Sequence, residues 1–257
     1  MIAVFVIAAA PIQWLVTKLA PSARAVIPRL FHRSLCAIMR VRVQVHGSPS
    51  LIRPQLIISN HISWLDIPAL GSRFPFWFLA KQEVGAWPII GFLARLQGCV
   101  FVNRNRKRAI PEVNLKICEA IHQGAALVLF PEATTGDGNR LQKFHSPHFE
   151  AAIAASLRSK MGADACLQPV TIVYTRRNGL PLDRLTRPSI AWYGDMGLLP
   201  HLLEILKSGP IDCELRFGSP FNARGDSRRK ALAQSARHEI QAGLASARCA
   251  AGGKFEN

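Results

Sequence analysis

A histidine and an aspartate stand five residues apart in the segment 59–66 (SNHISWLD). At this spacing the two side chains can meet across one turn, so that the carboxylate holds the imidazole in one tautomer and favours its charged form. With an ordinary pKa of about 6.5, an imidazole can take a proton from an alcohol at neutral pH. His61 and Asp66 are therefore candidates for a general base and its partner.

Taken alone, this spacing is weak evidence, because a histidine after an apolar run is a capping or core residue as often as a catalytic one. Further segments add to it. Residues 98–104 (GCVFVNR) end an apolar run with Arg104, whose guanidinium can bind a phosphate or carboxylate through two hydrogen bonds. Since three more basic residues follow at 106–108, the alternative is a solvated basic loop.

Residues 129–138 (LFPEATTGDG) leave another apolar run and enter a loop of small residues. Such loops expose backbone N–H groups and hydroxyls to an anion, although an ordinary turn is the alternative. Residues 167–172 (LQPVTI) place a proline near the start of an apolar strand. The spacing of Cys and His residues supports no metal site.

The elements that must position these segments alternate along the chain. Several apolar runs are continuous, which is typical of buried, largely parallel strands, and helical stretches lie between them. We therefore expect an α/β fold with a mostly parallel central sheet flanked by helices. The expected strands are Val41–His46, Leu56–Ser59, Phe76–Ala80, Cys99–Asn103, Ala126–Phe130, Cys166–Tyr174 and Ile211–Phe217, and the expected helices are Leu65–Ser72, Ile89–Leu96, Glu112–Gln123, Phe149–Met161 and Leu198–Lys207.

The start of the chain has the pattern of a membrane-associated segment. Residues 1–17 carry no charge but are shorter than the ~20 residues of a membrane span, and Pro11 would kink them. The seven charged residues between position 17 and Asp66 are all basic, which favours a cytoplasmic side and an anionic leaflet. Residues 26–40 alternate apolar residues with arginines, as in a peripheral membrane helix. The alternative is an ordinary buried N-terminal helix with a basic solvent face.

Composition limits the classes that remain. The 257 residues are 49% hydrophobic and 19% charged, which excludes a disordered chain, a coiled coil and a collagen-like fibre. The net charge of +16 predicts an anionic partner such as a membrane surface, a nucleic acid, or an acidic carrier or substrate. The six cysteines form no Cys-x-x-Cys pair, as expected for reduced thiols in a reducing compartment.

In their order, the four segments resemble the lysophospholipid acyltransferase family over about residues 25–220. The family pattern runs Asn-His-x4-Asp, Gly-x-x-Phe-x-x-Arg, Phe-Pro-Glu-Gly-Thr-Arg-Ser, and then a Pro-Val strand. The matching residues here are Asn60, His61 and Asp66, then Gly98, Phe101 and Arg104, then Phe130, Pro131, Glu132 and Thr134, then Pro169 and Val170.

Two positions depart from the pattern. Ala133 stands where the family usually has Gly, and Thr135 stands where it usually has Arg. The missing Arg weakens the case for a phosphate head group, since one fixed cation is absent. Arg140 is a candidate to compensate. The segment 134–138 (TTGDG) and the later run 192–196 (WYGDM) are similar to a bacterial subgroup that includes acyltransferases of lyso-ornithine lipid.

The resemblance implies transfer of a fatty acyl chain from an acyl-carrier-protein or coenzyme A thioester to a lysolipid hydroxyl. The first expected acceptor is 1-acyl-glycerol-3-phosphate, giving phosphatidate, and the alternative is lyso-ornithine lipid. His61 and Asp66 would be catalytic, while Asn60, Arg104, Glu132, Thr134 and Thr135 would bind substrate. No metal and no cofactor besides the thioester co-substrate is implied.

The expected place of action is the cytoplasmic face of the inner membrane, on an anionic surface. We expect a membrane-associated helical segment at 1–45, an acyltransferase catalytic domain at 46–220, and a basic helix and tail at 221–257. One rival is a nucleic-acid-binding protein, which the charge alone suggests but no motif supports. A second rival is a non-catalytic membrane scaffold, against which the intact His61 and Asp66 argue.

Overall fold

A single mixed sheet forms the centre of the computed structural model, which describes residues 12–16, 19, 25–102, 107–159 and 162–252. Seven strands follow the order β1-β8-β6-β2-β5-β3-β4, and β7 and β9 both pair with β6. The strands are β1 (Val41–His46), β2 (Gln55–Ser59), β3 (Trp77–Lys81), β4 (Val100–Val102), β5 (Ala126–Leu129), β6 (Ala165–Arg177), β7 (Leu180–Pro181), β8 (Ile211–Phe217) and β9 (Phe221–Ala223).

The middle of the sheet is parallel. β6, β2, β5, β3 and β4 pair in parallel in that order, and β8 reverses the direction beside β6. Every residue of β2 and β5 is buried, because helices cover both faces of these strands. The structure therefore confirms the mostly parallel sheet that the continuous apolar runs predicted.

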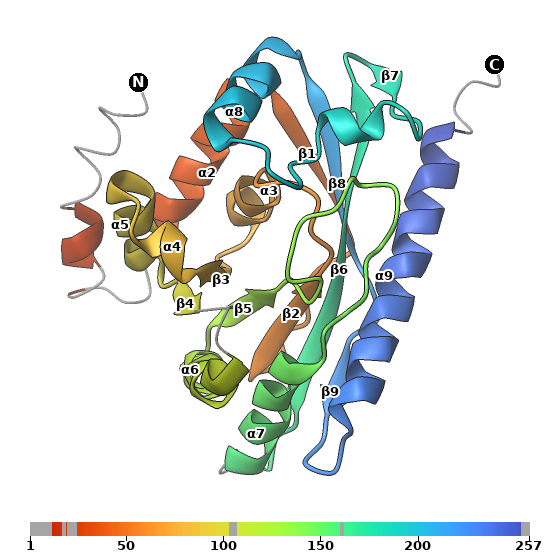
Figure 1. Cartoon of the computed structure of the whole chain (residues 1–257). Helices are drawn as coiled ribbons and strands as arrows, with labels where there is room; N and C mark the ends of the chain where they lie inside the picture. Colours follow the sequence, from red (N-terminus) through yellow and green to blue (C-terminus); the bar gives the residue numbers. More distant parts are fainter. Residues whose placement is uncertain (1–11, 17–18, 20–24, 103–106, 160–161, 253–257) are drawn as a thin grey trace.

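Two helical layers cover the sheet (Figure 1). Along β2, Leu56 and Ile58 face the core under α6, α7 and α9, whereas Ile57 faces the core that α2, α3 and α8 complete. The longer helices are α2 (Val26–Ile38), α3 (Asp66–Arg73), α5 (Pro88–Gln97), α6 (Ile110–His122), α7 (Glu150–Arg158), α8 (Leu198–Lys207) and α9 (Arg229–Gly252), and α4 (Gln82–Gly85) is a single turn.

The N-terminal segment was expected to be membrane-associated. Most of residues 1–24 lie outside the described part of the chain, and α2 begins at Val26 as the pattern of residues 26–40 predicts. Among the described helices, none combines the length and the apolar character that crossing a bilayer requires. The expected three-part division stays a prediction; β1, which pairs with β8, begins at Val41, inside the expected first part.

The C-terminal helix α9 packs closely on β6. Gly243 faces Thr171, and a Cβ on Gly243 would overlap the Thr171 hydroxyl oxygen. That hydroxyl donates a hydrogen bond of 3.3 Å to the carbonyl of Ile240 in α9. The helix therefore belongs to the same hydrophobic core as α6 and α7.

We expect Gly243→Val to destabilise the protein by about 1–3 kcal/mol, because the added side chain forces α9 away from β6. The matched control is Ala242→Val, on the exposed side of the same helix, which should cost about 0.5 kcal/mol through helix propensity alone. Urea unfolding measures both. Equal losses of stability for the two variants would contradict the close packing of α9.

Candidate active site

The carboxylate of Asp66 is the centre of the site and is fully buried. Its Oδ2 accepts hydrogen bonds from His61 Nδ1 at 2.8 Å and from the backbone N–H groups of Ile62 at 2.7 Å and Ser63 at 3.0 Å. Its Oδ1 accepts a hydrogen bond of 2.7 Å from the hydroxyl of Tyr174. Four donors thus replace the water that a buried carboxylate would otherwise lack.

These contacts fix the state of the His61 ring. An ionised carboxylate only accepts hydrogen bonds, so Nδ1 must donate, and Nε2 of the neutral ring keeps its lone pair. The ring stacks on Phe130 with centroids 4.1 Å apart and planes at 15°, and the His61 side chain is 15% exposed. The arrangement holds an oriented imidazole with its basic nitrogen available, as a general base requires.

Tyr174 is a site residue that the sequence did not reveal. It lies in β6, 108 residues after Asp66, inside an apolar run where it has the pattern of an ordinary core residue. Burial, and then the neighbouring Asp66 carboxylate, raise the pKa of its hydroxyl well above the ordinary value. Tyr174 therefore stays protonated and donates to Asp66. The only signal in the sequence was that a buried tyrosine hydroxyl needs a partner.

Asn60 links the segment from His61 to Asp66 to β6. Its Oδ1 accepts the backbone N–H of Ile172 at 2.8 Å, and its Nδ2 donates to the Ile172 carbonyl at 2.9 Å. The side chain thus continues the β2–β6 ladder beyond Ser59, the last residue that pairs. Asn60 is buried. Its side chain therefore holds the backbone next to His61 against β6.

Glu132 supports the same segment from the other side. Its Oε1 accepts the backbone N–H of His61 at 2.8 Å, and its Oε2 accepts that of Gln142 at 2.7 Å. Burial raises the pKa of the Glu132 carboxyl, although the two N–H donors act in the opposite direction. The structure therefore brings Glu132 beside His61, where its contacts hold the loop together.

The loop between β5 and the short 3-10 helix η3 (Pro147–Phe149) carries Thr134 and Thr135. Thr134 is exposed and Thr135 is half-buried. Ala133 has a φ of 61°, a left-handed conformation that favours glycine, which explains why the family usually has Gly there. Arg104 lies outside the described residues, so the structure does not test its expected role.

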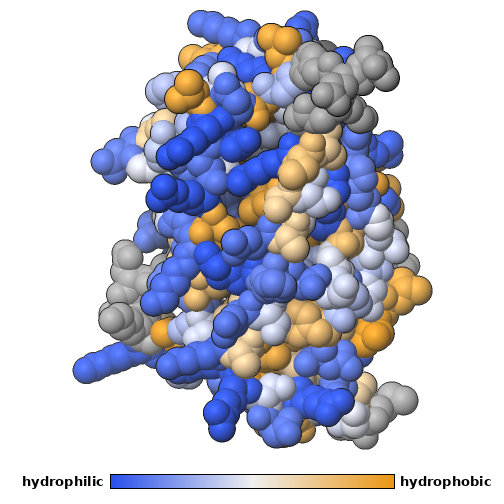
Figure 2. Space-filling view, turned by 90° about the vertical axis from the view of Figure 1, so that its right-hand side faces the viewer, coloured by the Kyte–Doolittle hydropathy of each residue, from blue (hydrophilic) through white to orange (hydrophobic). Residues whose placement is uncertain are grey.

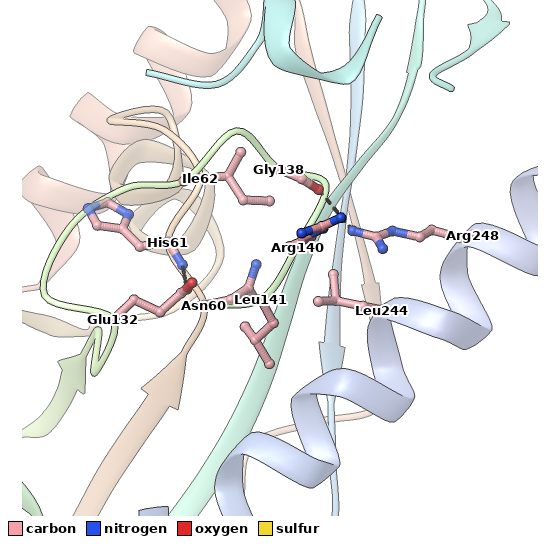
Figure 3. A pocket seen from close by; sticks show the side chains of 10 residues that line it. Asn60, His61, Ile62, Glu132, Gly138, Arg140, Leu141, Leu244 and Arg248 are labelled. Atoms are coloured by element: carbon pink, nitrogen blue, oxygen red, sulfur yellow. Dashed lines mark hydrogen bonds between the residues drawn. The ribbon is translucent and has the colours of Figure 1, made fainter. Parts of the chain in front are cut away.

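A small pocket lies beside this loop, and its lining includes Asn60, Glu132, Arg140 and Arg248. Figure 3 shows Arg140 and Arg248 on the side of the pocket away from the His61 ring. Arg248 comes from α9 and donates a hydrogen bond of 2.8 Å to the Gly138 carbonyl. No pattern in the sequence predicts a residue of the C-terminal helix at this pocket. No cluster of three metal-binding side chains occurs among the described residues.

We expect Tyr174→Phe to lower the free energy of unfolding by about 1.5–3 kcal/mol, because Asp66 loses one of its donors while the ring stays. The natural control is Tyr193→Phe, since the chain has two tyrosines and Tyr193 is half-buried. Denaturant unfolding at neutral pH compares them. If both variants unfold at the wild-type midpoint, the hydroxyl of Tyr174 does not stabilise the buried carboxylate.

Comparison with known proteins identifies the family. The model of the Acyltransferase family matches residues 42–173. The lyso-ornithine lipid O-acyltransferase of Brucella abortus is 40% identical over 92% of this chain and 88% of its own. The 1-acyl-sn-glycerol-3-phosphate acyltransferase of Neisseria meningitidis is 33% identical over 83% and 78%. The crystal structure of the 1-acyl-sn-glycerophosphate acyltransferase PlsC of Thermotoga maritima, 18% identical, covers 96% of this chain and 97% of that one at a TM-score of 0.61, which shows the same fold. The chain therefore belongs to the acyltransferase family.

Proposed function

We propose that this acyltransferase moves a fatty acyl chain from an acyl-carrier-protein or coenzyme A thioester to the free hydroxyl of a lysolipid, in membrane-lipid biosynthesis. The observation that carries the proposal is the hydrogen bond of 2.8 Å between His61 Nδ1 and the buried Asp66. It leaves Nε2 as the basic nitrogen of an oriented ring. The names of the relatives, which act on lysolipids, support the choice of acceptor class.

The proposed reaction needs no acyl-enzyme. His61 Nε2 takes the proton of the acceptor hydroxyl while its oxygen attacks the thioester carbonyl. Asp66 stabilises the imidazolium, which then protonates the leaving thiolate. Backbone N–H groups of the loop or the exposed Thr134 hydroxyl stabilise the oxyanion, and one such donor is worth about 3–4 kcal/mol. The chain has no Gly-x-Ser-x-Gly elbow, which fits direct transfer.

We propose two candidate acceptors. Lysophosphatidate is the first, with Arg104 and the loop of Glu132 positioning its head group. Lyso-ornithine lipid is the second, and two observations favour it: Thr135 offers no fixed cation, and relatives named for this acceptor are 40% and 41% identical. Lysophosphatidate is an anion at neutral pH, as the basic chain favours, whereas lyso-ornithine lipid is a zwitterion that offers a carboxylate to a cation.

The place of action that we propose is the cytoplasmic face of the inner membrane. Residues 1–45 would attach the enzyme there, since an apolar start is followed by basic residues only. The division into this segment, a catalytic domain at 46–220 and a basic C-terminal part at 221–257 remains part of the proposal. The excess of basic residues suits both an anionic leaflet and an acidic acyl carrier.

We expect His61→Ala to lower the rate of acyl transfer at least about 100-fold, because the base is lost. The matched control is His238→Ala, an exposed histidine of α9, which should keep wild-type activity. Transfer of radiolabelled palmitate from its carrier to each lysolipid measures the rate. A His61→Ala enzyme whose transfer rate stays within a few-fold of wild type would contradict the assignment of His61 as the general base.

We expect Thr135→Arg to raise kcat/KM for lysophosphatidate relative to lyso-ornithine lipid by about 10- to 100-fold. An Arg adds charge-assisted hydrogen bonds to phosphate, each worth roughly 1.5–3 kcal/mol, whereas Thr offers one neutral bond. The measurement is kcat/KM for both acceptors with wild type and variant. A wild type at least a hundredfold selective for lysophosphatidate and unchanged by the added Arg would contradict this expectation.

A further inference from the structure

The outer face of α8 carries an uncovered apolar stripe. Leu199, Leu203 and Leu206 follow the i, i+4, i+7 spacing of one helix face and are 66%, 48% and 42% exposed. The opposite face of α8 is also partly apolar and turns inward, with His201 and Ile205 buried. A helix that is apolar on both faces normally has a second partner. The described part of the chain supplies none for this stripe.

Other exposed apolar side chains gather on the neighbouring helices. α2 exposes Val26 and Leu30, and α5 exposes Ile90 and Phe92. The two helices are joined by a hydrogen bond of 3.0 Å between His32 and Gln97. In Figure 1, α2, α5 and α8 lie on the side of the sheet away from α9. The face that carries α9 is mostly hydrophilic, with hydrophobic residues in small separate patches (Figure 2).

The charges around the apolar residues indicate what covers them. The outer side of α2 adds the exposed Arg29 and Arg33, and no acidic residue precedes Asp66. α8 carries one exposed acid, Glu204, and ends with an exposed Lys207. Apolar side chains interspersed with cations bind an anionic bilayer, in which the leucines enter the interface and the cations contact lipid phosphates.

The uncovered stripe is connected to the catalytic segment. Trp64 Nε1 donates a hydrogen bond of 2.9 Å to His201 Nδ1 in α8. The backbone N–H of Trp192, shortly before α8, donates to the Ile62 carbonyl at 3.0 Å. Both bonds begin or end within the segment from His61 to Asp66. A bilayer bound at the outer face of α8 would therefore lie one helix diameter, about 10 Å, from the segment that carries His61.

We propose that Leu199, Leu203 and Leu206 insert into the interface of an anionic bilayer, as a membrane contact separate from residues 1–45, and that the acceptor reaches His61 from this side. The second half of this inference rests on the proposed function. Its physical advantage is that the acyl chain of a lysolipid stays in the bilayer while its hydroxyl reaches the site. Less apolar surface then has to be transferred into water.

The test uses the full chain and vesicles of phosphatidylcholine with about a quarter phosphatidylglycerol. Three variants are compared by vesicle flotation: serine at all three leucines of α8, methionine at the same three, and the control Leu115→Ser with Leu157→Ser. The control leucines are exposed on α6 and α7, on the other face of the sheet. Activity is measured with a vesicle-embedded long-chain lysolipid and with a short-chain lysolipid dissolved as monomers.

We expect the serine variant to lower the vesicle partition coefficient at least about tenfold and to lower turnover of the embedded acceptor with it. Turnover of the monomeric acceptor should stay within about twofold, and the methionine and control variants should bind like wild type. A serine variant that binds vesicles within about twofold of wild type overturns the inference. If it does not fold, Leu199→Ser alone is used, because Leu199 is the most exposed of the three.

The outcomes also separate this inference from the proposed function. A wild type that binds vesicles but acylates no lysolipid would refute the proposed function, while the partition coefficients would still decide whether α8 contacts the bilayer. A wild type that acylates lysolipids, with equal vesicle binding by the serine variant, would refute the α8 contact alone. Equal losses of turnover on monomeric and embedded acceptors would show damage to the site, and would overturn the entry route.

Discussion

A buried charge is the constraint on which the site depends. Asp66 has no exposed surface, and an ionised carboxylate without partners would cost several kcal/mol in such a place. Its four donors come from a short turn, a histidine ring and a distant strand. The order of β2, α3 and β6 around the carboxylate therefore cannot change without leaving a charge unpaired.

The sheet topology explains how these donors meet. β2 lies between β6 and β5 and is parallel to both, so the segments that follow β2 and β5 leave the sheet at the same edge. Open α/β sheets place ligands at this edge. Asn60 and Glu132 then fix the two segments against β6 and against each other. Hydrogen bonds from side chains to the backbone therefore hold the site together, and Asn60 and Glu132 fix the positions of the two segments.

Much of this arrangement could be predicted from the sequence. Periodicity placed the main strands and most helices within a few residues, because buried parallel strands have continuous apolar runs. The pairing of His61 with Asp66 was also predicted, because the contact is local. The contributions of Tyr174 and of Arg248 could not be predicted, since they come from strands and helices more than a hundred residues away. In the sequence, Tyr174 has the pattern of an ordinary core residue and Arg248 that of a solvated basic residue. Only the tertiary packing brings them to Asp66 and to the Gly138 carbonyl.

The left-handed backbone of Ala133 bears on how this family varies. A non-glycine residue pays roughly 1–2 kcal/mol for that conformation, which a stable domain can tolerate. Exchange between Gly and Ala at this position therefore changes the folding energy while the loop keeps its path. During evolution such an exchange can drift without selection on substrate. The neighbouring Thr135 is different, because replacing an arginine removes a charge, so these two departures from the family pattern carry unequal information about which lipid an ancestor used.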